Sequence, residues 1–578
     1  MDGEEWRMRE GATTALPLKG CGALFCPLGG RLLISTCLMA NRMPMRLPST
    51  LLVGLMAVSS TAQQVDWMTS SPVGYIMNPG MPRHTLASAP GHLVAARMVD
   101  VHFIYGVTPY GSVALDALDP ATGGTLLSCL LLDSVSVRAV VVDPAGIAYI
   151  AGRFMGDVLE FCDGSQLAGV GGTLFTENHF LLSWDLASGA PLWMRNLSAT
   201  YPQCEDVPSL ALDPEGHLWY IMQNFLDGYL VRVDVAGNDV DARAIDGIRR
   251  FGTISFDPWG GAYVSGSCEN GTLTFGGQGF PVESDEGYNM FLLRYRPDGT
   301  AGFAQFAADA TFQDPTVVAT ADGHAYLAGV LMQPEASWGG LLFTGSNWGS
   351  DLYLVKVDST GQFLWGVESN PMTGVIIGDM ERAAGPCITV DADDNVYLMG
   401  AIRGVVDWGN GVVSDGQIIS QRSLTVVAFE PSGMPQWAVT SEPSAWYVSA
   451  QTATVMAEPG SVHFSAHAAD PFTMGPFTVG AEDQQSVVLG RITEVTTGLE
   501  AVVASTGLQG WPNPASDVLF VEWPGSTAMS GTLLNAAGQQ VERVTLQPGR
   551  NSVDVHGLPA GLYLLRLADG SAARVVVE

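Results

Sequence analysis

The stretch from Val140 to Gly152, VVVDPAGIAYIAG, constrains the fold more than any other, because variants of it return six more times. It reads as a β-hairpin that starts with an apolar strand buried on both faces. Asp143 can accept a hydrogen bond from the backbone two residues on, Pro144 fixes the first corner, and Gly146 supplies the exit of the turn. The return strand ends on Gly152, where a missing side chain lets another backbone approach closely.

The copies share this order of strand, turn and strand, and differ in how completely they keep its residues. Full copies begin at Leu212, Phe256, Thr320 and Val390, and degenerate ones at His102 and Ala457. Each is followed by a second phrase, an apolar strand, a turn and often a Trp strand, as in FLLSWDLASGAPLW from Phe180. Aromatic and glycine pairs lie between the phrases, at Phe275, Trp338 and Trp408.

The spacing identifies the architecture. The 370 residues from Trp67 to Trp437 cover six intervals, about 62 residues each, which suits a four-stranded blade with long loops. One such sheet cannot bury two apolar faces alone, whereas a ring of them can. The composition agrees, with 47% hydrophobic and 15% charged residues, 68 Gly and 33 Pro. We therefore predict an all-β chain whose main part is a β-propeller.

The context of Trp67 matches the Trp strands of the repeats, while the last second phrase, VVLGRI from Val487, has no Trp strand after it. We predict that the N-terminal strand pairs into the last blade and closes the ring. The hairpin phrase of the repeat occurs seven times, which predicts seven blades. Its copies are marked by these residues: His102, Tyr149, Trp219, Tyr263, Tyr326, Tyr397 and His463.

The N-terminus predicts export. Residues 1–44 begin with acidic side chains, which is wrong for a leader, and are interpreted as a non-native or disordered extension ahead of the true start; a genuine extension is the alternative. Residues 45–62 read as a signal peptide with Arg46, an apolar run and cleavage between Ala62 and Gln63. That apolar run is too short to cross a bilayer and no run of about 18 follows, so we expect an exported protein without a transmembrane segment.

The charge excludes one class of partner. The net charge is −32, and Lys19 and Lys356 are the only lysines, so the surface should repel phosphate backbones and nucleic acid is not an expected partner. No catalytic motif, metal-binding motif or cofactor-binding motif stands out, and no cofactor is predicted. Ca²⁺ at Asp391, Asp393, Asp394 and Asn395 is the alternative, but these residues lie at a repeat turn and lack the EF-hand spacing.

Two histidines and the cysteines are candidates for other sites. His463 and His467 lie on one strand about 13 Å apart, too far to share a metal, and are interpreted as blade residues. Five cysteines follow the predicted cleavage site: Cys129, Cys162, Cys204, Cys268 and Cys387. One or two disulfides are expected, with Cys162–Cys204 conceivable and the connectivity left open.

Within residues 63–495 the phrases D..GN.Y..G, FGG and D..G...W resemble the bacterial extracellular β-propeller repeats of the SBBP type. The first and last copies are degenerate, and the third unit has lost its Trp near Asp241.

After a Thr-rich linker, residues 496–510, the segment 511–578 alternates short strands and turns, which predicts a small Ig-like β-sandwich. It closely resembles the type A C-terminal sorting domain of type IX secretion (the Por secretion system). The resemblance rests on these motif residues: Pro512, Asn513, Pro514, Ala515, Gly538, Leu558, Pro559, Gly561 and Tyr563. It implies Sec export, recognition by the outer-membrane machinery, and release or attachment at the cell surface, often with removal of the domain.

Three functions remain open. The first is a secreted or surface-displayed, non-enzymatic binding or adhesion scaffold whose loops contact glycans or proteins. The second is a secreted enzyme, a hydrolase, lyase or quinone-type dehydrogenase, that uses the central funnel of the propeller. The third is a structural component of an extracellular matrix.

Overall fold

In the computed structural model the described residues are 61–73, 84–104, 108–171, 177–309, 314–332, 336–344, 351–369, 379–417, 420–444, 448–455, 460–469, 471–496, 508, 510–535, 540–567 and 572–578. The expected extension and most of the expected signal peptide and linker lie outside them.

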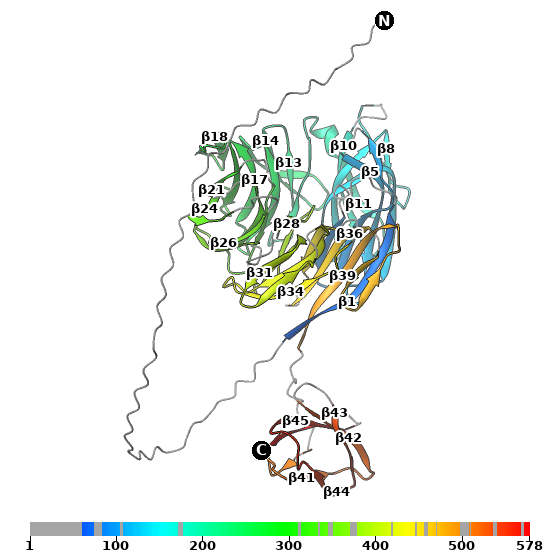
Figure 1. Cartoon of the computed structure of the whole chain (residues 1–578). Coiled ribbons are helices and arrows are strands. Elements are labelled where there is room, and N and C mark those ends of the chain that lie inside the picture. The colour runs from blue at the N-terminus through cyan, green and yellow to red at the C-terminus, as the bar shows by residue number, and fades with distance from the viewer. Residues whose placement is uncertain are drawn as a thin grey trace, which may run out of the picture. The chain divides into compact units, whose positions relative to one another are not determined.

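Within these residues, seven groups of four antiparallel strands follow one another along the chain, which confirms the prediction of an all-β propeller with seven blades. In Figure 1 they run from blue and cyan (β5, β10) through green (β17, β26) to yellow and orange (β34, β39). A short helix, α1 (Leu197–Thr200), follows the second blade and is capped by the side chain of Asn196.

The strands of the blades, each from first to fourth, have the following bounds. Blade 1 contains β2 (Thr85–Ala89), β3 (His92–Met98), β5 (Thr108–Leu118) and the start of β6 (Thr125–Val142). Blade 2 contains the end of β6, β7 (Ile147–Met155), β10 (Glu177–Asp185) and β11 (Pro191–Asn196). Blade 3 contains β12 (Leu210–Leu212), β13 (Leu218–Gln223), β14 (Asp227–Val233) and β15 (Asp239–Asp246). Blade 4 contains β16 (Arg250–Phe256), β17 (Ala262–Glu269), β20 (Tyr288–Tyr295) and β21 (Ala301–Asp309). Blade 5 contains β22 (Thr316–Ala319), β23 (Ala325–Leu331), β26 (Asp351–Val357) and β27 (Phe363–Glu368). Blade 6 contains a first strand in two pieces, β28 (Asp379–Arg382) and β29 (Ile388–Val390), then β30 (Val396–Arg403), β33 (Ser423–Phe429) and β34 (Pro435–Thr440). Blade 7 contains β35 (Val448–Val455), β36 (Ser461–Ala469), β39 (Gln485–Thr496) and β1 (Thr61–Val73).

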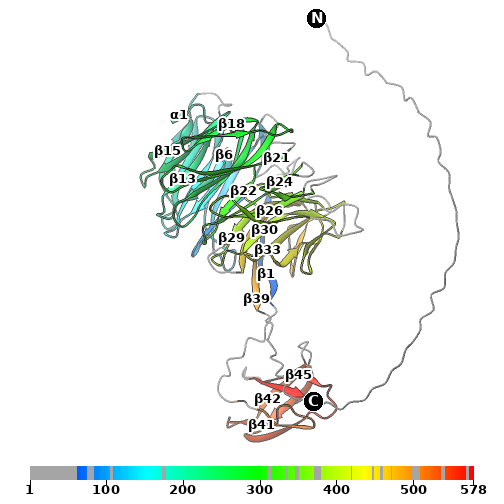
Figure 2. The ribbon, with the colours of Figure 1, turned by 90° about the vertical axis from the view of Figure 1, so that its left-hand side faces the viewer.

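The ring is closed by the N-terminal strand, as the sequence predicts. β1 pairs with β39 along its length, from Thr61 opposite Thr496 to Val73 opposite Gln485. Both views show the blue β1 beside the orange β39 (Figures 1 and 2). The first strands of successive blades contact one another in order, and the last of them, β35, contacts β2 of blade 1. The outermost position of blade 7 is therefore filled by the start of the chain.

The repeated hairpin has the predicted chemistry. Asp143 Oδ1 accepts the backbone N–H groups of Ala145 and Ile147 at 2.9 and 2.8 Å, and Gly146 takes a φ of 84°. A side chain at Gly152 would collide with the Ser136 carbonyl and the Phe180 ring. Glycine is therefore required there by the close approach of the neighbouring strands.

The residue at the Trp position of the second phrase joins a blade to the turn of the next one. Trp365 Nε1 donates to the Pro431 carbonyl at 3.0 Å, and its ring covers Gly433 in the hairpin turn of blade 6. Equivalent pairs along the ring are Leu127 on Gly189, Trp193 on Gly237, Phe303 on Gly361 and, at the seam, Trp67 on Gly123. Blade 3, which has Asp241 at this position, uses Arg243 instead: its guanidinium lies against Gly299 and over the Trp219 ring.

One copy was placed wrongly. The second strand of blade 1 is β3, so the first copy is the phrase SAPGHLVAA from Ser88 and not HFIYG from His102. His102 begins β4 (His102–Ile104), a short strand beside β5. The sequence pattern does not mark this hairpin, because Val94 stands where the other copies have an aromatic residue or His, three residues after the turn glycine. The blade count is unaffected.

The aromatic and glycine pairs form small hairpins between the second and third strands of blades. They are the turns of β18–β19 (Gly271–Phe275, Gln278–Val282), β24–β25 (Ser337–Trp338, Leu341–Leu342) and β31–β32 (Val405–Gly409, Val412–Asp415). Similar hairpins are β8–β9 (Val158–Glu160, Gln166–Ala168) and β37–β38 (Phe472–Met474, Phe477–Val479). Gly339 packs on the Phe363 ring and Gly475 on Val65. These hairpins therefore lie against outer strands of the blades, and β18 also pairs with β15, the outer strand of blade 3.

The cysteines pair differently from the one pairing considered. Cys129 on β6 is bonded to Cys162, which follows β8, with 5.4 Å between their Cα atoms. The disulfide therefore links blade 1 to blade 2, and Cys204 is a buried free thiol together with Cys268 and Cys387. Sequence alone could not choose this partner because the two residues meet only once consecutive blades pack.

The C-terminal domain has two sheets. One has the order β40 (Gly510–Trp511), β41 (Val518–Trp523), β44 (Gly549–Asp554), and the other β43 (Gln540–Leu546), β42 (Met529–Asn535), β45 (Gly561–Leu567), β46 (Ala572–Val577). They share one apolar core that includes Leu519, Val521, Leu533, Leu565 and Val575. Two sheets around a common core agree with the predicted sandwich, and its Ig-like topology stays a prediction.

Candidate functional site

A cavity of about 460 Å³ lies among the first and second strands of blades 2 to 6. Because the first strands line the ring axis, side chains from several blades meet there. Its lining includes four arginines and two aspartates: Arg138, Arg153, Arg250, Arg382, Asp206 and Asp314. This basic lining is notable in a chain of net charge −32.

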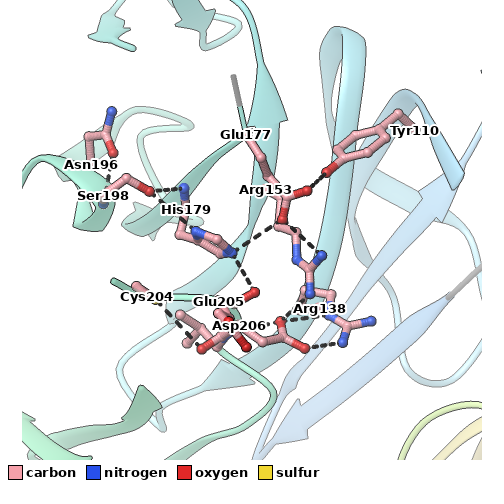
Figure 3. A network of polar contacts seen from close by, with 11 residues as sticks. Tyr110, Arg138, Arg153, Glu177, His179, Asn196, Ser198, Cys204, Glu205 and Asp206 are labelled. Carbon is pink, nitrogen blue, oxygen red and sulfur yellow. Dashed lines mark hydrogen bonds and ion pairs between the residues drawn. The ribbon is translucent and has the colours of Figure 1, made fainter. Parts of the chain in front are cut away.

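Asp206 joins two of the arginines (Figure 3). Arg153 Nη2 lies 2.9 Å from Asp206 Oδ1, and Arg138 Nε donates to the same oxygen at 2.9 Å, while Arg138 Nη2 contacts Oδ2. The Val207 backbone N–H also donates to Oδ1 at 2.9 Å. Asp206 is thus fixed by several charge-assisted bonds and holds both guanidiniums in place.

A β-bulge gives Arg138 its direction. In the pairing of β6 with β7 the register shifts between Val137 and Ala139, so Arg138 has no residue opposite it. A bulge turns a side chain away from the regular alternation of the strand. Arg138 therefore reaches Asp206, which lies ahead of β12 in the next blade.

Glu177 closes the other side of this network. Its carboxylate lies 2.9 Å from Arg153 Nη1 and accepts the Tyr110 hydroxyl at 2.6 Å, with His179 Nε2 3.4 Å away. Burial raises the pKa of Glu177, but the hydrogen bond from His179, the charge of Arg153 and the Tyr110 hydroxyl outweigh it and lower the pKa to about 2. Burial and the bond to Glu177 raise the pKa of Tyr110. At neutral pH this carboxylate is therefore charged and the phenol neutral.

A second ion pair lies across the cavity, and one arginine differs from the rest. Arg382 Nη2 contacts Asp314 Oδ1 at 2.6 Å, and the Asp314 charge raises the pKa of Arg382 against the effect of burial. Arg250, at the start of β16, is exposed. Among the described residues, no carboxylate lies within ion-pair distance of the Arg250 guanidinium.

This arrangement suits binding more than acid–base chemistry. A general acid or base needs a pKa near the working pH, whereas Glu177 is held far below it and both cavity aspartates are ion-paired. Guanidiniums positioned by carboxylates instead offer fixed hydrogen-bond donors to a ligand. The sequence analysis did not identify these residues, because they share no position in the repeat: Arg138 lies within β6, Arg153 near the end of β7, Arg250 at the start of β16 and Arg382 at the end of β28.

The calcium candidates serve the repeat turn. Asp391 Oδ1 accepts the Asp393 and Asn395 backbone N–H groups at 3.0 and 2.9 Å, and its Oδ2 accepts the Tyr397 hydroxyl at 2.8 Å. Asp394 has a φ of 62° and takes the place of the usual turn glycine. In blade 3, Asp213, Glu215 and His217 also gather ligand atoms, but the Asp213 carboxylate is engaged by the turn and by Trp219 Nε1.

The two histidines of blade 7 are buried and lie apart from the cavity. His463 stands where most copies have Tyr; its ring lies 5.8 Å from that of Trp67, and Nε2 donates to the Pro120 carbonyl at 3.1 Å. His467 Nδ1 lies 3.2 Å from His84 Nε2, and His467 Nε2 lies 3.3 Å from Gln485 Oε1. Both therefore pack where blade 7 meets blade 1.

The predicted sorting residues hold the C-terminal strand. Asn513 Nδ2 donates to the Arg574 carbonyl at 2.8 Å, and its Oδ1 accepts the Val576 N–H at 2.7 Å. Pro512 and Pro514 flank Asn513, and the buried Ala515 exchanges backbone bonds with Val576 and Glu578. The PNPA motif thus fastens the last strand to the start of the domain.

The second motif forms the turn before β45. Leu558 N donates to the Val555 carbonyl, and the Tyr563 hydroxyl donates to the Pro559 carbonyl at 2.8 Å, with Gly561 between them in sequence. Gly538 lies outside the described residues. The predicted cleavage residues Ala62 and Gln63 lie near the start of β1, opposite Val495 and Glu494.

Fold and tail together define an all-β repeat protein with a separate C-terminal domain. Residues 509–578 match the secretion system C-terminal sorting domain. This tail is the type IX sorting signal, and the chain is a protein exported to the outer cell surface or secreted. The tail also gives it the secretion machinery as a partner.

No curated protein matches the chain in sequence. Solved structures similar to it include a Bacteroides caccae protein of unknown function, 11% identical over 57% of this chain and 94% of that chain, with a TM-score of 0.30. Others are a Pyrococcus horikoshii acylaminoacyl peptidase (8%, 76% and 52%, TM-score 0.33) and Drosophila plexin A in complex with semaphorin 1b (8%, 74% and 88%, TM-score 0.31). The assignment of the ring rests on its strand order.

In the part of the chain that the structure describes, no helix is long and apolar enough to cross a membrane.

Proposed function

We propose that this protein is a secreted or surface-displayed propeller that binds an extracellular glycan or protein and does not catalyse its conversion. The observation that supports this most is the cavity near the ring axis, where polar side chains of several blades converge and the acidic groups are ion-paired. Such a convergence of a few fixed polar groups is typical of ligand sites.

The same proposal includes the route. The chain is made with a signal peptide that is cleaved between Ala62 and Gln63, which leaves nearly all of β1 to close the ring. The tail is removed during or after passage through the outer membrane. Mass spectrometry of both termini, in strains with and without a working type IX system, tests this. A protein that stays periplasmic with Glu578 in place would contradict it.

Binding is tested with the purified mature protein against arrays of extracellular glycans and surface proteins. We expect saturable binding of a ligand that is recovered unchanged. Steady accumulation of a hydrolysis, elimination or oxidation product in proportion to protein concentration would instead establish an enzyme. Self-assembly without any ligand would favour a matrix component.

A further inference from the structure

The cavity concentrates positive charge in an acidic protein. The chain has 26 basic and 58 acidic side chains, yet four arginines line this one cavity. The described carboxylates in contact with them are Asp206, Glu177 and Asp314, which leaves one guanidinium uncompensated. The charged side chains of the cavity therefore sum to a net positive charge, which raises the local concentration of anions.

Two arginines of the cavity have hydrogen-bond donors without a partner among the described residues. Arg250 is exposed and has no carboxylate partner, whereas Arg138, Arg153 and Arg382 are each held by Asp206 or Asp314. Arg153 Nε is buried and has no acceptor. A buried donor without an acceptor in the protein is commonly satisfied by an ordered water or ion.

From this geometry we propose that the cavity binds the oxyanion of a small ligand, a carboxylate or a sulfate or phosphate ester, with Arg250 as its main charged contact. The proposal rests on the proposed binding function and names the chemistry of its ligand. Planar guanidiniums match carboxylate and phosphate oxygens in pairs of hydrogen bonds. The volume of about 460 Å³ suits a small ligand such as an acidic mono- or disaccharide. The negative surface disfavours long polyanions, so the anion enters as a small molecule or a chain end.

The test is isothermal titration calorimetry of the full mature protein with four probes: digalacturonate, glucose 6-sulfate, glucose 6-phosphate and neutral cellobiose. We expect at least one anionic probe to bind more tightly than cellobiose, and its affinity to fall as NaCl rises from 50 to 300 mM. The carboxylate and ester probes separate the two sources of oxyanion.

The variant Arg250→Gln should weaken binding of that anion by about tenfold or more, because it removes a charged hydrogen-bond donor. Arg250→Lys keeps the charge and loses the paired donors of the guanidinium, so its affinity for the anion should lie between those of the wild type and Arg250→Gln. Arg249→Gln is the matched control. Arg249 is the preceding residue, but its guanidinium lies near Glu269 and over the Phe225 ring, outside the cavity.

Anion binding that is lost in Arg250→Gln and kept within about twofold in Arg249→Gln supports the proposal. It is overturned if no anion binds better than cellobiose, or if both variants lose affinity equally. Saturable array binding with no preference for the anionic probes would leave the scaffold function standing while refuting the anion site, and so would anion binding that is unchanged in Arg250→Gln. Far-ultraviolet circular dichroism of each variant verifies that the fold is intact.

Discussion

The seam of the ring gives the sharpest stability prediction. Trp67 is 7% exposed; its Nε1 donates to the Pro120 carbonyl at 3.0 Å, and its ring covers Gly123 in blade 1. Trp67→Ala removes this contact between blade 7 and blade 1. Truncating a buried Trp costs about 3–5 kcal/mol of unfolding free energy, because it creates a cavity as well as losing apolar contact.

The matched control is Trp365→Ala. Trp365 makes the same contacts one interface further on, with Nε1 on the Pro431 carbonyl at 3.0 Å and its ring on Gly433. Both variants should unfold at lower guanidinium concentration. The two variants should differ in which strands are loosened. β1 is joined to blade 7 by non-covalent contacts, chiefly its pairing with β39, whereas β27 is joined to its hairpin partner by the chain as well.

Hydrogen–deuterium exchange with mass spectrometry distinguishes the two. In Trp67→Ala the amides of β1 and β39 should exchange about 10²-fold faster or more, as expected if the opening of the seam becomes easier by the same 3–5 kcal/mol. In Trp365→Ala these amides should exchange at the wild-type rate. Unchanged exchange in Trp67→Ala, or equal acceleration in both variants, would refute the view that this strand holds the ring closed.

Three other predictions concern the seam histidines, the disulfide and the tail. Burial lowers the pKa of His467 to about 4, so the unfolded chain binds a proton at this residue more readily than the folded ring does. The contribution of His467 to the free energy of unfolding should be fully present above pH 6.5 and fall by on the order of 3 kcal/mol towards pH 4, so the melting temperature should fall less in His467→Gln than in wild type. Cys129→Ala with Cys162→Ala should cost about 3–4 kcal/mol of unfolding free energy, because the bond closes a loop with a sequence separation of 33. In the denatured mature protein, which starts at Gln63, alkylation before reduction should label Cys204, Cys268 and Cys387 alone, and labelling of Cys129 or Cys162 would contradict the pairing. Asn513→Ala should reduce the secreted fraction on immunoblots and raise the periplasmic one, because it leaves the Arg574 carbonyl and the Val576 N–H without their side-chain partner. The control Asn551→Ala, which loosens a turn away from the last strand, should be secreted at wild-type levels.

The parts of the fold that could be predicted depend on contacts close in sequence. The repeat places an aromatic residue three positions after one turn glycine and another four positions after the next, as at Gly323 with Tyr326 and Gly361 with Trp365. Those two rings meet in the same blade, 5.7 Å apart. Where the aromatic residue is replaced, as by Val94 in blade 1, the copy was placed wrongly, although the hairpin forms around Gly91 all the same.

The cavity could not be predicted, for two physical reasons. Arg138, Arg250 and Arg382 come from blades separated by more than a hundred residues, so they meet only after the ring has closed. Bulges also disturb the alternation of the inner strands: the register shifts at Val137/Ala139 in β6 and at Phe251/Ile254 in β16, beside two of these arginines. A pattern of period two assigns the wrong face to a side chain at or beyond a bulge. The repeat thus determines the regular outer parts of each blade, while departures from it aim the side chains at the ring axis, where the ligand is proposed to bind.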